Sequence, residues 1–132
     1  MIVVDTMILA YMMVNSPFSA DCHRLKEVQP DWCVPRYAEV ELMNVIWQHL
    51  RRGDLDFEGA AARYRVGRAM AQAVLDVDDR DVLRIAYDLD CSVHDARFVS
   101  LARESGVPLV TYNKNLLAKA AEALVPGQLL PG

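Results

Sequence analysis

The chain opens with Ile2-Val3-Val4-Asp5, a short run of β-branched residues that ends in a carboxylate. An uninterrupted run of this kind is typical of a strand that is buried on both faces inside a parallel sheet. The pattern from Thr6 to about Met13 is helical, so we expect the strand to lead directly into a helix. Because ligand sites in parallel sheets lie at the carboxyl ends of the strands, Asp5 stands where chemistry is expected.

Short apolar runs continue to alternate with amphipathic stretches along the rest of the chain. Further strands are predicted at residues 32–34, 74–77 and 109–111, with an additional edge strand at 127–130. The helices predicted between them cover residues 19–28, 37–52, 57–73, 78–89, 95–104 and 115–124. This alternation predicts an α/β fold, a three-layer α/β/α sandwich around a mainly parallel central sheet of four or five strands.

Length and composition fit one globular domain. The 132 residues are 53% hydrophobic and 24% charged, which is enough apolar material to build a core. No repeat or linker-like segment interrupts them, so residues 1–132 are predicted to form a single domain. The formal net charge is -4, so any contact with nucleic acid would need a local basic patch or a metal ion that bridges to phosphate.

Three cysteines, Cys22, Cys33 and Cys91, are widely spaced and odd in number. That pattern predicts neither a disulfide framework nor a zinc site, and it favours a reducing, cytoplasmic location. The longest apolar run, from Met7 to Val14, is far too short to cross a bilayer. No basic residue precedes it as one would in a signal peptide, so we expect no association with a membrane.

Three carboxylates and one amide fall where this fold would bring strand ends and helix starts together. Asp5 ends the first strand, Asp95 begins a helix and Asn113 follows the fourth strand. Glu41 lies in an otherwise apolar stretch of a helix, and Glu39, two residues earlier, cannot share its face. Each residue alone fits an ordinary cap, turn or surface role, and Asp5 is as well suited to cap the helix that follows it.

The arrangement of these residues is more informative than any one of them. Clustered carboxylates repel one another unless a cation neutralises them, and hard oxygen ligands favour Mg²⁺ or Mn²⁺. A metal ion held in this way lowers the pKa of a bound water and orients a phosphate for in-line attack. The acidic residues therefore predict phosphodiester hydrolysis better than the chemistry of an organic cofactor.

The order and spacing of the same residues resemble the PIN-domain family. The opening strand with Asp5 and Thr6 resembles the first motif of that family. Its second motif, Pro-x5-Glu-x2-Asn-x2-Trp, is matched by Pro35, Glu41, Asn44 and Trp47. The third, Tyr-Asp-Ala-x-Tyr-x-x-Leu-Ala, resembles the nine residues from His94 to Ala102, and the fourth, Thr-x-Asp-x-x-Leu, resembles those from Thr111 to Leu116. The matches follow the order of the family over nearly the whole chain, and the length is typical of VapC-like toxins.

The resemblance implies a PIN-like fold and a function. It implies an Mg²⁺- or Mn²⁺-dependent endoribonuclease that hydrolyses RNA phosphodiester bonds, as the toxin of a toxin–antitoxin pair. The partners it implies are an RNA substrate, a VapB-like antitoxin and a second copy of the chain in a homodimer. The residues it implies are Asp5, Glu41 and Asp95 for metal binding and catalysis, with Thr6 and Asn113 supporting the site.

Several basic and apolar residues are candidates for contact with partners. Arg97 and Lys114 flank motif residues and are predicted to reach RNA. Arg63, Arg65 and Arg68 lie in a stretch without acidic residues, which fits an RNA or antitoxin contact as well as a solvated helix face. The residues that are candidates to form a groove for an antitoxin helix are Tyr11, Met12, Met13 and Trp47. For Trp47, a position in the core is the stronger expectation.

Two positions depart from the family pattern. Asn113 stands where a fourth carboxylate is usual, and Met7 stands where a small polar residue is common. A neutral ligand gives less charge to hold a second ion, so the sequence leaves one and two metal ions open. The alternative function is a catalytically weakened PIN-like module that binds RNA or protein. A receiver-type phosphoacceptor and a haloacid-dehalogenase-like phosphatase fit less well, because both need further acidic residues that this chain lacks.

Overall fold

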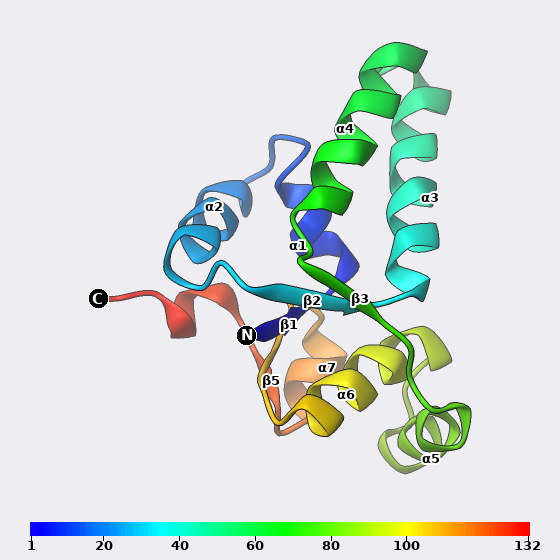
Figure 1. Cartoon of the computed structure of the whole chain (residues 1–132), viewed down its shortest axis with the longest axis vertical. Coiled ribbons are helices and arrows are strands. Elements are labelled where there is room, and N and C mark those ends of the chain that lie inside the picture. Colours follow the sequence, from blue (N-terminus) through cyan, green and yellow to red (C-terminus); the bar gives the residue numbers. More distant parts are fainter.

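A computed structural model describes the whole chain, from Met1 to Gly132, and Figure 1 labels its elements. Five strands form one sheet in the order β3-β2-β1-β4-β5, and every neighbouring pair is parallel. The strands are β1 (Ile2–Val4), β2 (Trp32–Pro35), β3 (Ala73–Leu75), β4 (Leu109–Val110) and β5 (Ala123–Leu124). The predicted α/β class is confirmed, and the sheet is entirely rather than mainly parallel.

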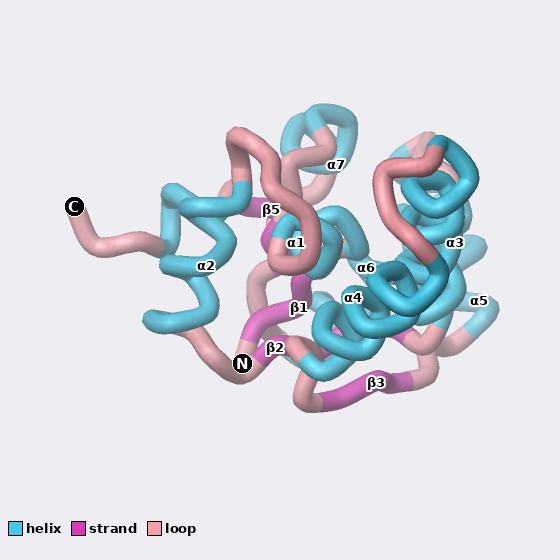
Figure 2. The backbone as a smooth tube through the Cα atoms, turned by 90° about the horizontal axis from the view of Figure 1, so that it is seen from above, coloured by secondary structure: helices cyan, strands magenta, loops and turns pink.

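Helices cover both faces of the sheet. They are α1 (Thr6–Tyr11), α2 (Ser19–Val28), α3 (Tyr37–Arg52), α4 (Phe57–Ala69), α5 (Asp79–Leu89), α6 (Val93–Ser105) and α7 (Lys114–Lys119), followed by the 3-10 helix Pro126–Leu129. Figure 1 shows α1 to α4 above the sheet and α5 to α7 below it, so the molecule has three layers. Seen from above in Figure 2, α2 lies on one side of α1, and the paired α3 and α4 lie on the other. None of the helices combines the length and the apolar character needed to cross a membrane.

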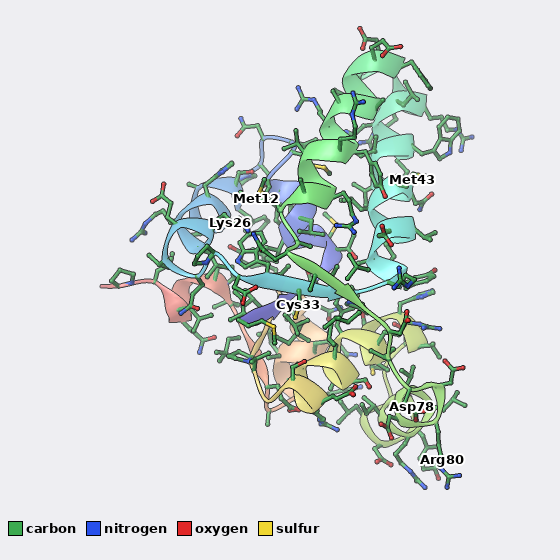
Figure 3. The ribbon with its side chains drawn as sticks, viewed as in Figure 1. Met12, Lys26, Cys33, Met43, Asp78 and Arg80 are labelled. Carbon is green, nitrogen blue, oxygen red and sulfur yellow. The ribbon has the colours of Figure 1, made fainter.

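The core is centred on the two innermost strands. All residues of β1 and β2 are buried, and Trp32 is the largest side chain that solvent does not reach. Figure 3 shows side chains filling the space on both faces of the strand that carries Cys33. Fully burying an aliphatic or aromatic side chain contributes about 1.5–3 kcal/mol. These buried strands therefore fix the position of the residues that follow them.

Local signals predict the ends of two helices correctly. Gly53 ends α3 and Gly106 ends α6, both with a positive φ that glycine adopts without strain. The predicted start of α6 at Asp95 is two residues late, because Ser92 caps this helix and its hydroxyl accepts a hydrogen bond from the Asp95 backbone nitrogen at 3.1 Å. Asp95 is therefore in the first turn of α6 and is not its cap.

The C-terminal region differs from the prediction. The helix predicted over residues 115–124 ends at Lys119, and Ala123–Leu124 form β5 instead. The alanine-rich sequence favours a helix, but the free edge of β4 pairs with β5 and overrides that propensity. Residues 127–130, predicted as an edge strand, belong largely to the 3-10 helix that begins at Pro126.

Smaller differences concern the ends of three other elements. Helix α1 ends at Tyr11 and not at Met13, and α4 ends at Ala69 and not at residue 73. The strand predicted at 74–77 is β3, which covers Ala73–Leu75 and follows the register of β2.

The buried face of α3 also differs from the prediction. Ala38, Leu42 and Ile46, spaced by four residues, are its buried side chains. Trp47, for which a core position was expected, is 52% exposed. The prediction was wrong because α3 extends beyond the sheet together with α4 as a projecting arm, visible at the top of Figure 1, so only one stripe of α3 meets the core.

Candidate active site

One pocket lies at the carboxyl ends of β1 and β4. Its polar lining residues are Asp5, Thr6, Glu41, Asp95 and Asn113, and its apolar and aromatic lining residues are Met7, Tyr11, Phe98 and Tyr112. The structure thus brings together all five residues that the sequence predicted for the metal site and its support. The two residues predicted to contact RNA, Arg97 and Lys114, are not part of this lining.

Asp5 has two structural roles at once. Its Oδ1 accepts a hydrogen bond from the backbone nitrogen of Ile8 at 3.1 Å, which caps α1, so the expected cap is present. Its Oδ2 accepts a hydrogen bond from the hydroxyl of Thr111, which follows β4. Burial raises the pKa of Asp5 from its ordinary value of 3.8 to about 6, against the opposing effect of these hydrogen bonds. The negative charge of Asp95 raises this pKa further.

Glu41 reaches the same pocket from α3. Its Oε1 accepts a hydrogen bond from the buried hydroxyl of Thr6 at 2.9 Å. Burial raises the pKa of Glu41, while the Thr6 hydrogen bond and the charges of His94 and Arg97 act to lower it. Glu39 points elsewhere and forms an ion pair with Arg68, with Oε2 2.8 Å from Nε. Of the two glutamates, the structure places Glu41 in the pocket.

Asp95 and Asn113 are linked across the pocket. The side-chain amide of Asn113 donates to Oδ2 of Asp95 at 3.2 Å. The amide oxygen of Asn113 accepts a hydrogen bond from the backbone nitrogen of Leu116 at 3.1 Å, so this residue also caps α7. A neutral residue at this position therefore holds Asp95 by a hydrogen bond, where a carboxylate would repel it in the absence of a cation.

The donor set suits a hard divalent ion that keeps part of its water shell. All the side-chain donors are oxygens, as Mg²⁺ and Mn²⁺ prefer. No group of three or more Asp, Glu, His or Cys side chains is close enough together to hold an ion jointly. Mg²⁺ is commonly bound through one or two carboxylates, with water completing its shell, so two of these carboxylates suffice. Burial raises the pKa of Asp5 and the charge of Asp95 raises it further, so a nearby cation would favour the ionised form of Asp5.

The basic residues that are candidates for RNA contact differ in how they are engaged within the chain. Arg63 donates to the Met13 carbonyl at 2.5 Å, and Arg68 is paired with Glu39, so neither is free for phosphate. Two of the three arginines of α4 are therefore engaged in contacts within the chain, and Arg65 is exposed. Arg97 lies 5.4 Å from the ring centre of Tyr37, and its Nε is buried without a hydrogen-bond partner. Lys114 is exposed at the start of α7.

Aromatic residues around the pocket were missed as a group. Tyr112 lies 5.9 Å from Tyr11 and 4.5 Å from Phe18, measured between ring centres, and the two tyrosines line the pocket. Thr111, which holds Asp5, was noted only as part of a motif. Its place between a strand and the motif position Asn113 was the signal that could have assigned it a role.

An all-parallel sheet with carboxylates gathered at the ends of its central strands defines an α/β protein with a candidate site for metal-assisted hydrolysis. The PIN-domain family matches residues 2–123, and this chain belongs to that family. The family resemblance predicted from the motifs is thereby confirmed.

Similar proteins include nucleases and toxins of the VapC type. Exonuclease VapC9 of Pyrobaculum aerophilum is 30% identical over 84 residues, which are 64% of this chain and 63% of that protein, so the match spans less than two thirds of the relative. The chain is thus a homologue of a PIN-domain nuclease.

Solved structures share the fold at lower sequence identity. The crystal structure of PAE2754 from Pyrobaculum aerophilum aligns with a TM-score of 0.78 at 23% identity, covering 96% of this chain and 90% of that one. A toxin–antitoxin complex from Klebsiella pneumoniae aligns at 0.71 and 15%, covering 96% and 98%. VapC20 of Mycobacterium tuberculosis, a toxin that cleaves the sarcin–ricin loop, aligns at 0.66 and 18%, covering 92% and 98%.

Proposed function

We propose that this protein is an Mg²⁺- or Mn²⁺-dependent endoribonuclease and the toxin of a toxin–antitoxin pair. The observation that carries the proposal is the gathering of Asp5, Glu41 and Asp95 in one pocket at the carboxyl end of the sheet. The relative named as an exonuclease supports phosphodiester hydrolysis in general, and the toxin that cleaves the sarcin–ricin loop supports RNA as the substrate.

The residues of the pocket have separable roles in this proposal. Asp5 and Asp95 would hold the metal ion, which would supply a water of lowered pKa and neutralise charge on the phosphate. Glu41, whose pKa burial raises, accepts the proton of the attacking water as its oxygen forms the new bond to phosphorus. Thr6 orients Glu41 through its hydrogen bond. The bond from phosphorus to the leaving oxygen breaks as the new bond forms, and the leaving oxygen takes up a proton from solvent.

Asn113 favours a single firmly bound ion. Its amide nitrogen donates to Asp95, and its amide oxygen accepts a hydrogen bond at the start of α7. Because the amide is neutral, Asn113 contributes no charge to a second metal site. We propose that any second ion is bound only together with the substrate phosphate.

An apolar groove on the α3–α4 arm is the proposed docking site of the antitoxin. The groove is lined by Met43, Ile46, Trp47, Leu50, Phe57, Ala60, Ala61, Tyr64 and Arg65. Two of these, Trp47 and Phe57, are 52% and 68% exposed, as expected for large apolar side chains that a binding partner would cover. Figure 3 shows Met43 on the arm and Met12 beside α1, so Tyr11, Met12 and Met13 do not share this groove with Trp47 as the sequence had suggested. A homodimer of this chain remains part of the proposal.

The decisive experiment is cleavage of a mixed structured-RNA pool in Mg²⁺ or Mn²⁺, with EDTA as a control. Asp5→Asn and Asp95→Asn keep the size of each side chain, and Asp5→Asn also keeps a cap for α1. We expect each variant to lose cleavage by at least a hundredfold while its circular dichroism and melting transition remain those of a folded protein. Asp56→Asn is the matched control, because Asp56 caps α4 outside the pocket.

The two outcomes separate the nuclease from the alternative. Metal-dependent cleavage that both pocket variants lose supports the nuclease. A folded wild-type protein that binds RNA without cleaving it would support the weakened binding module, for which the neutral Asn113 is the specific observation.

A further inference from the structure

A second hollow, of about 410 Å³, lies directly beside the carboxylate pocket. It is lined by Thr6, Met7, Tyr37, Val40, Glu41, Asn44, Val45 and His94. Thr6, Met7 and Glu41 line both cavities, so the two cavities are adjacent. The volume is in the range of small-molecule sites. A group bound here would lie next to the phosphate that the carboxylate pocket is proposed to cleave.

Two flat rings form one wall of this hollow. Tyr37 begins α3 and His94 lies in the first turn of α6, and their rings are stacked with 4.7 Å between centres and 8° between planes. Arg97, one turn after His94, holds its guanidinium 5.4 Å from the Tyr37 ring centre. The pair is therefore fixed from two helices, while His94 itself remains exposed to solvent.

The rest of the lining matches a flat heteroaromatic ligand. Val40 and Val45 are apolar, and Val40 is 61% exposed. Asn44, one turn after Glu41, has an exposed side-chain amide with no hydrogen-bond partner. A side-chain amide both donates and accepts hydrogen bonds, so it can pair with the edge of a nucleobase. The face of the same nucleobase can stack on an aromatic ring.

We propose that this hollow is a subsite for one nucleobase of single-stranded RNA, next to the scissile phosphate, and that the base is held by stacking on the Tyr37–His94 pair. The proposal rests on the proposed nuclease function, which places the phosphate at Asp5 and Glu41. The net charge of this protein is negative, so it attracts RNA phosphates weakly overall. Stacking on a base adds binding energy that does not depend on this electrostatic attraction. The subsite also requires an unpaired base, which directs cleavage toward loops and single strands.

The test compares oligomers that differ only in their bases. Pentamers of uridine and of adenosine, and an abasic ribose-phosphate pentamer with the same number of phosphates, each carry a 3′ dye. Their binding is measured by fluorescence anisotropy in EDTA, so that no cleavage occurs. We expect the wild-type protein to bind the base-containing pentamers at least ~5-fold more tightly than the abasic one, since one stacked base contributes roughly 5- to 100-fold.

Variants of the stack are expected to reduce this preference for bases. Tyr37→Leu and His94→Ala should lower the ratio of affinities about fivefold or more, and Tyr37→Phe should retain it. Tyr87→Leu is the matched control, because Tyr87 is 81% exposed on α5 and lines a different hollow. Thermal melting checks each variant, and His94→Ala carries the test if Tyr37→Leu does not fold.

The outcomes distinguish this subsite from the nuclease itself. The base subsite would be overturned if both stack variants kept the wild-type ratio of affinities for base-containing and abasic pentamers. An equal loss of affinity for all pentamers would leave that ratio unchanged and would overturn it as well. If the ratio falls as expected but the RNA pool is not cleaved in Mg²⁺ or Mn²⁺, the base subsite stands and the nuclease proposal fails. Cleavage without any preference for bases is the opposite result.

Discussion

At the scale of single residues, Asp5 combines a structural role with a chemical one. The same carboxylate caps α1, accepts the Thr111 hydroxyl and faces the pocket. Burial disfavours the ionised form of Asp5, which is the form that binds a metal ion. In the absence of a cation, the ionised carboxylate therefore destabilises the folded protein. Such a residue links stability, pH and metal binding, and each link is measurable.

Replacing Asp5 should stabilise the metal-free protein above pH 6. The pKa of Asp5 is about 6 in the folded chain and 3.8 ordinarily, so the folded state holds this proton more tightly. The stability that the proton contributes is complete below about pH 4 and is lost as the pH rises through 6. In EDTA at pH 7.5 we expect Asp5→Asn to melt at a higher temperature than the wild type. The shift should be roughly 3–5 °C for each kcal/mol by which the substitution raises the free energy of unfolding.

Melting curves between pH 4.5 and 8 test this expectation, with Asp56→Asn as the control. The gain should shrink toward pH 4.5, where the wild-type carboxyl is largely protonated. A gain that is the same at every pH, or a loss at pH 7.5, would show that ionisation of Asp5 does not strain the folded state.

Asn113→Asp should separate metal affinity from stability. A carboxylate at this position would face Asp95 without the hydrogen bond that the amide now donates. We therefore expect a lower melting temperature in EDTA, and tighter Mn²⁺ binding by calorimetry, by about threefold or more, because one more charge faces the ion. Asn115→Asp, on the exposed side of α7, is the matched control. Unchanged or weaker binding in Asn113→Asp would place residue 113 outside the metal site.

Among the residues of the pocket, the sequence could predict those that carry charge at a strand end or in a motif. Asp5, Glu41 and Asp95 follow from motif spacing, and the structure brings them together. Tyr37, which lines the adjacent hollow, could not be found in this way, because its partner His94 is 57 positions away and only the tertiary fold stacks their rings. The distinction between Glu39 and Glu41 likewise depended on the motif, since helix geometry separates them without saying which faces the pocket.

At the scale of elements, helices with a local stop signal and strands with a β-branched or apolar run were predictable, whereas the edge strand β5 was not. Gly53 and Gly106 mark helix ends by their own backbone preference. The two residues of β5 have no such signal, because they form a strand only through hydrogen bonds such as Leu109 N to Glu122 O at 3.0 Å. The exposure of Trp47 has the same origin, since it depends on how far α3 extends beyond the sheet.

The packing of α4 on the end of α1 should be sensitive to one added methyl group. A Cβ at Gly67 would lie 2.0 Å from the Met13 sulfur, and both residues are buried. Alanine has the higher helix propensity by about 1 kcal/mol, but crowding in a packed core typically costs about 1–3 kcal/mol. We expect Gly67→Ala to lower the free energy of unfolding in urea, whereas Gly127→Ala, with open space around its Cα, should leave it unchanged.

A double-mutant cycle with Met13→Ala identifies the cause. If the methyl group clashes with the Met13 side chain, the penalty of Gly67→Ala should largely disappear in the Met13→Ala background. Equal penalties in both backgrounds would mean that the clash is not with Met13.

At the scale of the whole molecule, the fold separates the proposed functions in space. The carboxylate pocket and the stacked rings lie at the carboxyl ends of the strands, where α3 and α6 begin. The apolar groove lies on the arm that α3 and α4 extend away from the sheet (Figure 1). Because α3 carries Glu41 near its start and Trp47 further along, a partner bound on the arm would contact the helix that supplies a residue of the pocket.

Metal binding should stabilise the whole domain and do so only through the pocket. A ligand that binds the folded state alone raises stability by mass action, by about 2.7 kcal/mol at a hundred times its Kd, which for a domain of this size is roughly 10 °C. We expect Mn²⁺ or Mg²⁺ to raise the melting temperature of the wild type in a saturable way at pH 7.5. The rise should be smaller at pH 5, because Asp5 with a pKa of about 6 must lose its proton to bind the ion. Asp95→Asn should reduce the rise strongly and Asp56→Asn should not, whereas an equal rise in all three proteins would mean that the ion binds elsewhere on the acidic surface.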